Sequence, residues 1–334
     1  MSDEIFSNET DYDYDTDTTT CTSISTEITF YIFLLLEIPS VLCSLVLFYY
    51  FIRLREYLFR DHSNTTIIYL LLGTSLVTSI DMPIIIIHLQ NCYYIESMKD
   101  PSAFCIFWIL CDYTFYSLNL WLMAFACFER YLSIFFKQFI MRNRKRRFLL
   151  YYALVIFITL FPVLWYIYLI LIYPCAQTDF DYTQITCDGS CYQAVDDPVT
   201  QNTDWFLADL LPTFLVIFFI LVLILHVLYQ RHKISRHSTQ RNIWKRTRKM
   251  FLQLVPIAFI FLAFNMPLIM VGMLSITDPW YDTTPYYYAN SFSYLLPLLM
   301  PFAVLSKQKE ILKRLRILFK LRGANRIATL DGTV

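Results

Sequence analysis

Residues 105–131 read CIFWILCDYTFYSLNLWLMAFACFERY. The segment is apolar over more than the roughly 20 residues that a helix needs to cross a bilayer. It opens on Cys105, carries one carboxylate, Asp112, inside the apolar run, and closes on the triplet Glu-Arg-Tyr. A carboxylate within a membrane is costly, so we expect Asp112 to face the protein interior and to have a partner there. The role of the segment depends on how many similar helices surround it and on which side of the membrane each end lies.

The composition of the whole chain is that of a membrane protein. Of its 334 residues 57% are hydrophobic, 18% aromatic and 16% charged, and the mean hydropathy is +0.47, well away from an ordinary soluble domain. Seven stretches are long and apolar enough to span a bilayer. They are residues 28–52, 65–89, 104–128, 148–173, 205–229, 250–275 and 286–305. The sequence therefore predicts an all-α membrane protein with a seven-transmembrane helix bundle.

Lysine and arginine lie almost entirely on one side of these spans. They fall in segments 53–64, 129–147, 230–249 and 306–334, whereas the opposite connecting segments hold only Lys99. Because cytoplasmic loops carry the excess of positive charge, we expect the N-terminus outside and the C-terminus inside. The predicted parts are an acidic extracellular tail (1–27), a seven-helix domain (28–305) and a cytoplasmic tail (306–334).

The N-terminal tail is polar and acidic, and it lacks the basic region with which a cleavable signal peptide begins. We therefore expect the first span to act as the targeting signal. Asn8 begins the sequon Asn-Glu-Thr on the outer side and is a predicted glycosylation site. The matching triplet at Asn64 faces the cytoplasm and is discounted.

Six cysteines are expected on the outer side, where the compartment is oxidising. An even set there predicts up to three disulfides, whose pairing the sequence leaves open among 15 connectivities. These cysteines are Cys21, Cys92, Cys105, Cys175, Cys187 and Cys191. Cys43, Cys111 and Cys127 fall within spans.

Seven spans, an outside N-terminus, and a third span that begins with Cys105 and ends in Glu-Arg-Tyr resemble the rhodopsin-like (class A) G-protein-coupled receptors. The resemblance covers about residues 28–320. Its most specific element is the spacing of 25 positions between Cys105 and Arg130, which is usual in that family. Other family anchors lie at matching positions: Asn64 and Pro83 in the second span, then Pro162, Pro212, Pro267 and Pro301 in the fourth to seventh.

Several motifs depart from the family pattern. Thr74 stands where the family has a buried aspartate and Asn119 where it has a serine, so a conventional sodium site is not expected. The sixth-span CWxP motif reads Phe264-Asn265-Met266-Pro267, and the seventh-span NPxxY motif reads MPFAV from Met300. The chain is thus similar to divergent members of the family, such as the lineage-specific receptor expansions of invertebrates.

The resemblance implies an extracellular ligand pocket around Asp112. Asp112 matches the position that holds the ammonium of amine ligands, and Tyr294 matches the residue whose hydroxyl bonds to that carboxylate. Further predicted ligand-binding residues are Asp81, Tyr113, Tyr116, Asn265 and Asn290. The alternative reading is that Asp112 is structural, bonded to Tyr294, or protonated.

The residues themselves favour a positively charged ligand. Glu37, Asp81 and Asp209 are further acids in or near spans, and no span has Lys or Arg at matching depth. These acids are therefore protonated, hydrated or met by a cationic ligand, an amine or a basic peptide. Acidic outer loops would raise the local concentration of such a ligand.

The resemblance also implies a disulfide that fastens the 174–204 loop over the pocket. It pairs Cys105 with Cys191 or Cys187, and leaves Cys175 to bond with the remaining one. On the cytoplasmic side, Glu129, Arg130 and Tyr131 are the predicted residues for coupling to a heterotrimeric G protein. Residues 307–320 have the spacing of a basic amphipathic eighth helix on the inner membrane surface.

The sequence contains no motif that favours catalysis. No histidine pairs with a cysteine or carboxylate at metal-ligand spacing and there is no phosphate-binding glycine loop, so we expect no enzyme, no metal and no cofactor. The basic loops are expected to contact membrane lipids, not nucleic acid. A transporter or channel that uses the buried acids is the alternative, and a non-signalling membrane scaffold is a third. The expected location is the plasma membrane.

Overall fold

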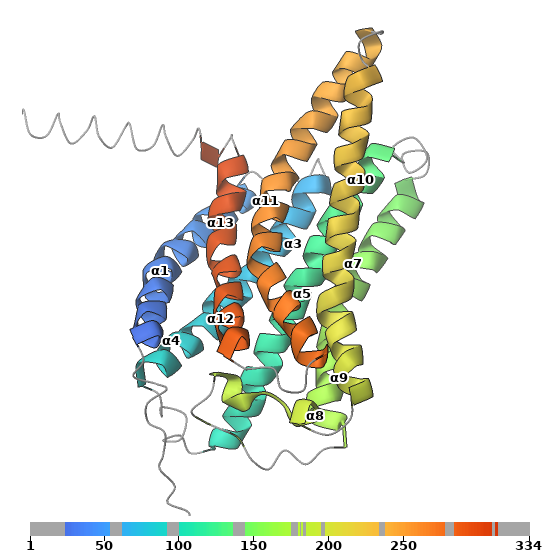
Figure 1. The fold of residues 1–334 in the computed structure, drawn as a ribbon. Helices are drawn as coiled ribbons and strands as arrows, with labels where there is room; N and C mark the ends of the chain where they lie inside the picture. Colours follow the sequence, from blue (N-terminus) through green and yellow to red (C-terminus); the bar gives the residue numbers. More distant parts are fainter. Residues whose placement is uncertain are drawn as a thin grey trace, which may run out of the picture.

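The computed structural model describes residues 24–53, 62–91, 100–135, 144–174, 180, 182, 185–194, 198–233, 238–277, 284–308 and 311–312. The predicted glycosylation site Asn8 and the predicted eighth helix beyond Leu312 lie outside the described residues. Every regular element among these ranges is helical (Figure 1).

Seven helical spans are long and apolar enough to cross a membrane, which confirms the predicted all-α seven-helix bundle. The helices are α1 (Ile24–Arg53), α3 (His62–Leu76), α4 (Met82–Asn91), α5 (Pro101–Phe135), α7 (Arg144–Ile167), α8 (Cys191–Ala194), α9 (Pro198–Trp205), α10 (Leu211–Lys233), α11 (Ser238–Thr277), α12 (Thr284–Ser293) and α13 (Leu295–Lys307). Short turns are η1 (Val77–Asp81), η2 (Tyr168–Ile172), η3 (Ile185–Asp188) and η4 (Phe206–Leu210).

The helix α5 runs through the middle of the bundle and packs against α3, α7 and α10 (Figure 1). Pro101 occupies its first turn, where a missing N–H costs nothing, and no proline or glycine follows within the helix. Around it, α1 packs on α4 and α13, while α11 packs on α12 and α13. The apolar segment 105–131 is thus part of the most central helix of the fold.

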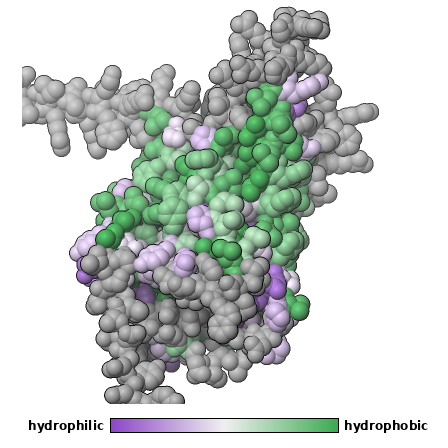
Figure 2. Space-filling model, viewed as in Figure 1, coloured by the Kyte–Doolittle hydropathy of each residue, from purple (hydrophilic) through white to green (hydrophobic). Residues whose placement is uncertain are grey.

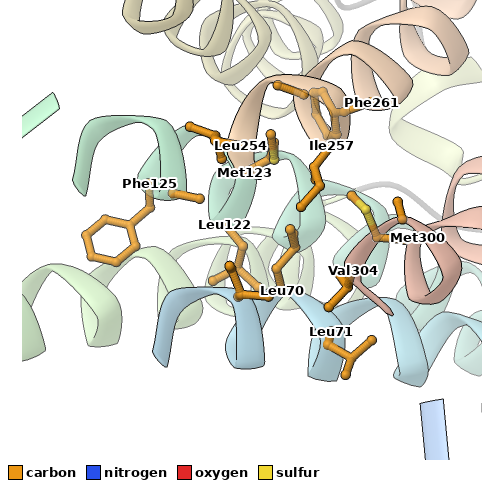
Figure 3. Packing of buried hydrophobic residues seen from close by; sticks show 14 of the residues in the cluster. Leu70, Leu71, Leu122, Met123, Phe125, Leu254, Ile257, Phe261, Met300 and Val304 are labelled. Atoms are coloured by element: carbon orange, nitrogen blue, oxygen red, sulfur yellow. The ribbon is translucent and has the colours of Figure 1, made fainter. Parts of the chain in front are cut away.

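Side chains from α3, α5, α11 and α13 fill the centre of the bundle (Figure 3). Leu71, Met123, Phe261 and Met300 are fully buried there. The outer surface is apolar as well: Leu35, Ile52 and Phe259 are 74%, 76% and 71% exposed. On the face drawn in Figure 2, hydrophobic residues cover a continuous area over the helices, and hydrophilic residues gather near the end that carries α8 and α9. Such a surface fits hydrocarbon, not water.

Three π-helical turns each lie directly before a proline. The backbone N–H groups of Met82, Tyr173 and Leu211 bond to the carbonyl five residues back, and Pro83, Pro174 and Pro212 follow them. A proline cannot donate to the carbonyl four residues back and its ring displaces that carbonyl. Two of the widened turns that result contain an acid, Asp81 in η1 and Asp209 in η4. A π-helical turn changes the direction of these side chains relative to a regular helix.

The fifth span begins earlier than predicted. The expected start was residue 205, whereas α9 begins at Pro198 and continues through η4 into α10. Proline is favoured in the first turn of a helix, so Pro198 starts the span and the polar residues after it extend the apolar helix by two turns. Asp204, expected in the loop, is therefore part of a spanning helix.

Candidate functional site

Asp112 is held by a residue at a break in the last span. The side chain of Asp112 is 8% exposed, and the hydroxyl of Tyr294 donates to its Oδ1 at 2.9 Å. Tyr294 separates α12 from α13, because Pro297 cannot donate to the carbonyl of Ser293. The ring of Phe33 from α1 packs edge-on against Tyr294 at 6.4 Å. Three helices therefore fix the position of this carboxylate.

Asp81 lies against Asp112 from the side of α3 and α4. Its side chain is 1% exposed, and the indole Nε1 of Trp108 donates to its Oδ1 at 2.9 Å. The carboxyl groups of Asp81 and Asp112 are close enough to interact directly with one another. On the other side of Trp108 lies the ring of His88, at 5.6 Å. The two acids thus form one buried pair.

A cavity opens on the other side of Asp112, toward the centre of the bundle. It offers about 30 Å³ to the centres of water-sized molecules, which is room for roughly two or three waters. Its polar lining consists of Thr74, Asp112, Tyr116, Asn119, Asn265, Ser293 and Tyr294, with apolar residues such as Phe261 and Met300 between them. A small polar head group fits this space, whereas a whole drug-sized ligand does not.

The polar groups of this cavity present mostly acceptors. The hydroxyls of Thr74 and Ser293 donate to backbone carbonyls at 3.0 and 2.7 Å, and that of Tyr294 donates to Asp112. Each asparagine donates one N–H to its own helix, Asn119 to Phe115 at 2.8 Å and Asn265 to Phe261 at 3.0 Å. The amide Oδ1 atoms of both asparagines are buried, and no donor in the described part of the chain reaches them. We call this the acceptor-rich cavity.

Four of the seven predicted ligand-binding residues meet in the acceptor-rich cavity: Asp112, Tyr116, Asn265 and Tyr294. The other three lie elsewhere among the described residues. Asp81 is behind Asp112, as given above. The hydroxyl of Tyr113 points away to the loop and donates to Gln193 Oε1 at 3.0 Å. Asn290 is half-buried on α12, where its carbonyl accepts from Ser293.

A second acidic position lies nearby, on η4. The hydroxyl of Tyr116 is buried and has no hydrogen-bond partner among the described residues, and Asp209 lies near enough to interact with it electrostatically. The hydroxyl of Tyr286 lies within the electrostatic range of Asp209, Asp112 and Asp204. Tyr286 is nevertheless 46% exposed, so it faces open space. Acids and tyrosines therefore surround the approach to Asp112 from α5, η4 and α12.

The disulfide over this region joins Cys105 to Cys187 of η3, with the two Cα atoms 5.9 Å apart. Thr186 and Cys187 have φ values of 56° and 54°, in the left-handed region that side chains rarely adopt. Cys191 is also disulfide-bonded, and its expected partner Cys175 lies outside the described residues. The loop is thus fastened to the start of α5.

One residue that anchors this loop, Asp204, was not predicted from the sequence. Asp204 Oδ1 accepts from Trp165 Nε1 at 2.8 Å, and Oδ2 accepts from the hydroxyl of Tyr192 at 2.7 Å. Tyr192 is fully buried, and burial raises the pKa of its hydroxyl, so it donates. The available signal was Pro198, because a helix that begins there places Asp204 inside the bundle. We call Asp204, Trp165 and Tyr192 the loop anchor.

At the opposite end of α5, Glu129 and Arg130 are both buried, at 6% and 3% exposure. Thr66 of α3 donates to Glu129 Oε2, and the hydroxyl of Tyr151 of α7 lies 3.0 Å from the Thr66 hydroxyl. Glu129 also lies within the electrostatic range of Arg130. Glu129 is therefore built into the contact of α3, α5 and α7, whereas the ring of Tyr131 packs on Phe219 of α10.

Comparison of the chain with models of known protein families and with curated protein sequences finds no match. The fold and the apolar surface define a multi-pass, all-α membrane protein with seven candidate spans.

Proposed function

We propose that the protein is a G-protein-coupled receptor of the plasma membrane, with its N-terminus outside, that binds a cationic extracellular ligand at Asp112. The observation that carries the proposal is the acceptor-rich cavity beside that carboxylate. Asn119 and Asn265 each present a buried carbonyl oxygen that no donor among the described residues reaches, and Asp112 adds a negative charge. An ammonium group supplies positive charge and several N–H donors, and it has the size that the cavity admits.

The charge distribution of the bundle supports a cation. The seven spans contain two Lys or Arg residues, Arg53 and Arg130, and both lie at the far ends of their helices from the acceptor-rich cavity. Fixed positive charge is therefore missing from the part of the spans that holds Asp81, Asp112, Asp204 and Asp209. A bound cation would compensate part of this negative charge in a medium of low dielectric constant.

The opposite end of α5 supports a signalling role. Arg130 stands 25 positions after the disulfide cysteine Cys105, the spacing of the rhodopsin-like receptors that the chain resembles. The bonds between Thr66, Tyr151 and Glu129 join three helices at this end. We propose that ligand binding changes the packing there and exposes Arg130 to a heterotrimeric G protein.

The test is a screen of primary amines and basic peptides against ligand-dependent nucleotide exchange by G proteins in cells that express the full chain. Arg130→Ala is expected to abolish exchange while surface expression persists. Asp112→Asn is expected to weaken the potency of an active amine at least about tenfold, which corresponds to about 1.4 kcal/mol. An amine-dependent ion current that survives Arg130→Ala would instead favour a transporter or channel. The absence of both responses would favour a scaffold.

A further inference from the structure

The burial and proximity of Asp81 and Asp112 limit how many of the two carboxyl groups can be ionised. Both carboxyl groups are buried, at 1% and 8% exposure, and they are close enough to interact directly with each other. When two carboxyl groups share one buried site, the charge of the first strongly opposes ionisation of the second. In the absence of a bound cation, one of the two groups therefore carries a proton.

The hydrogen bonds around the pair indicate which oxygen holds this proton. Asp112 Oδ1 accepts from Tyr294, and Asp81 Oδ1 accepts from Trp108. Asp81 Oδ2 is buried, and it has no donor within the described ranges of the chain. A buried, ionised oxygen without a donor is costly. A protonated Oδ2 is itself a donor, and the Asp112 carboxylate is the acceptor within its reach.

The surroundings of the two acids agree with this assignment. Asp112 lines the acceptor-rich cavity, where water or a cation can compensate its charge. Asp81 lies behind it in the apolar cluster that contains Val77, Met82 and Trp108. The ionised form is better solvated at Asp112 and the neutral form fits Asp81.

We propose that Asp81 is a neutral carboxylic acid that donates a hydrogen bond from Oδ2 to Asp112 and so turns the Asp112 carboxylate toward the acceptor-rich cavity. Asp81 is then a positioning residue, not a contact for the ligand. The pair presents one negative charge, which matches one monovalent cation. The consequence for ligands rests on the proposed function, whereas the protonation of Asp81 does not.

Other titratable groups surround the pair. Those in electrostatic contact with Asp81 or Asp112 are Cys111, Tyr113 and Tyr116 on α5, Tyr286 on α12, and Tyr294. His88 on α4 packs on Trp108 from the other side. The proton is therefore to be assigned with a method that distinguishes carboxyl groups from these other residues.

Infrared spectroscopy of the full chain in lipid nanodiscs at pH 7, without ligand, makes this distinction. The spectrum of the unaltered protein minus that of Asp81→Asn is expected to contain a positive C=O stretch of a carboxylic acid. Asp204→Asn is the matched control, because Asp204 is buried too but both its oxygens have donors; its difference spectrum should contain carboxylate bands. Carboxylate bands for Asp81→Asn would overturn the proposal.

A second measurement uses methylammonium chloride as the probe and thermal unfolding in nanodiscs as the readout. An amide at position 81 still donates to Asp112, whereas Leu does not. Asp81→Leu should therefore need at least about tenfold more methylammonium than Asp81→Asn for the same stabilisation, the loss of one hydrogen bond to a charged group. Equal losses in both variants would mean that the charge of Asp81 contacts the cation, and would overturn the proposal. If methylammonium does not stabilise even the unaltered protein, the proposal of a cationic ligand is refuted. The infrared test of the protonation of Asp81 is unaffected by that outcome.

Discussion

The hydroxyl of Tyr294 donates a 2.9 Å hydrogen bond to Asp112 across 182 positions of sequence. It joins the central helix α5 to the point where the last span breaks into α12 and α13. The acceptor is buried and the donor has one hydrogen, so this contact holds the last span in register with α5. The same hydroxyl leaves only its lone pairs to the acceptor-rich cavity.

Replacing Tyr294 with Phe tests this contact. The ring and its edge-on packing with Phe33 remain, so the variant loses only the hydroxyl. We expect the free energy of unfolding to fall by about 1.5–3 kcal/mol, the range for a hydrogen bond to a charged group. The measurement is a lower melting temperature in detergent. Tyr168→Phe is the control, because the Tyr168 ring lies on the outer surface at 45% exposure. Equal melting temperatures for the two variants would contradict the expectation.

The contact of Thr66 with Glu129 predicts a second effect. Thr66→Val keeps the shape of the side chain but leaves a buried carboxylate oxygen without its donor. We expect destabilisation by about 1–3 kcal/mol, and recovery in Thr66→Ser, which restores the hydroxyl. Tyr151→Phe should cost less, because the Tyr151 hydroxyl pairs with that of Thr66, whose own hydrogen bond to Glu129 remains. Urea or thermal unfolding of the three variants decides the order, and a Ser variant as unstable as the Val variant would refute the role of the hydroxyl.

The seven spans could be predicted because each is a continuous apolar run near the length of a bilayer crossing. The contact between Tyr294 and Asp112 was predicted from the resemblance to a receptor family. Hydropathy and helical periodicity alone would not have predicted it. Hydropathy could not give the start of the fifth span, since the turns from Pro198 to Asp204 are polar. It is Pro198, a local backbone signal, that would have corrected it.

The contacts of the candidate site were less accessible to sequence reasoning. Asp81 was expected to open toward the ligand cavity, but it lies behind Asp112 and bonds to Trp108. Its direction depends on the π-helical turn before Pro83, and a turn of that kind rotates a side chain relative to the regular helical period. Side-chain partners such as Asp204 and Tyr192 depend on loop conformation, which periodicity does not encode.

The loop anchor predicts that a single carboxylate stabilises the loop end of the bundle. Asp204→Ala leaves two donors, Nε1 of the half-buried Trp165 and the hydroxyl of the buried Tyr192, without their acceptor. At about 1–3 kcal/mol for each orphaned donor, the expected loss is about 2–6 kcal/mol. The control is Thr203→Ala, an exposed neighbour whose hydroxyl bonds within its own helix. Protease sensitivity of the 185–194 loop is the second readout: cleavage should become faster in Asp204→Ala and stay unchanged in the control.

Gly73 predicts a coupling between helix packing and the acceptor-rich cavity. A Cβ atom at this position would lie 2.8 Å from Asn119 Oδ1 and 3.2 Å from Leu122 Cδ1. Alanine would by itself favour the helix by about 1 kcal/mol over glycine, but here it must displace the Asn119 side chain from the cavity. Gly73→Ala is therefore expected to destabilise the protein. In an Asn119→Ala background the nearest contact is gone, and the same substitution should become neutral or stabilising.

The double-mutant cycle measures this difference as an interaction energy of about 0.5–3 kcal/mol between residues in contact. Additive effects of the two substitutions would mean that Gly73 is not required for the approach of α3 to Asn119.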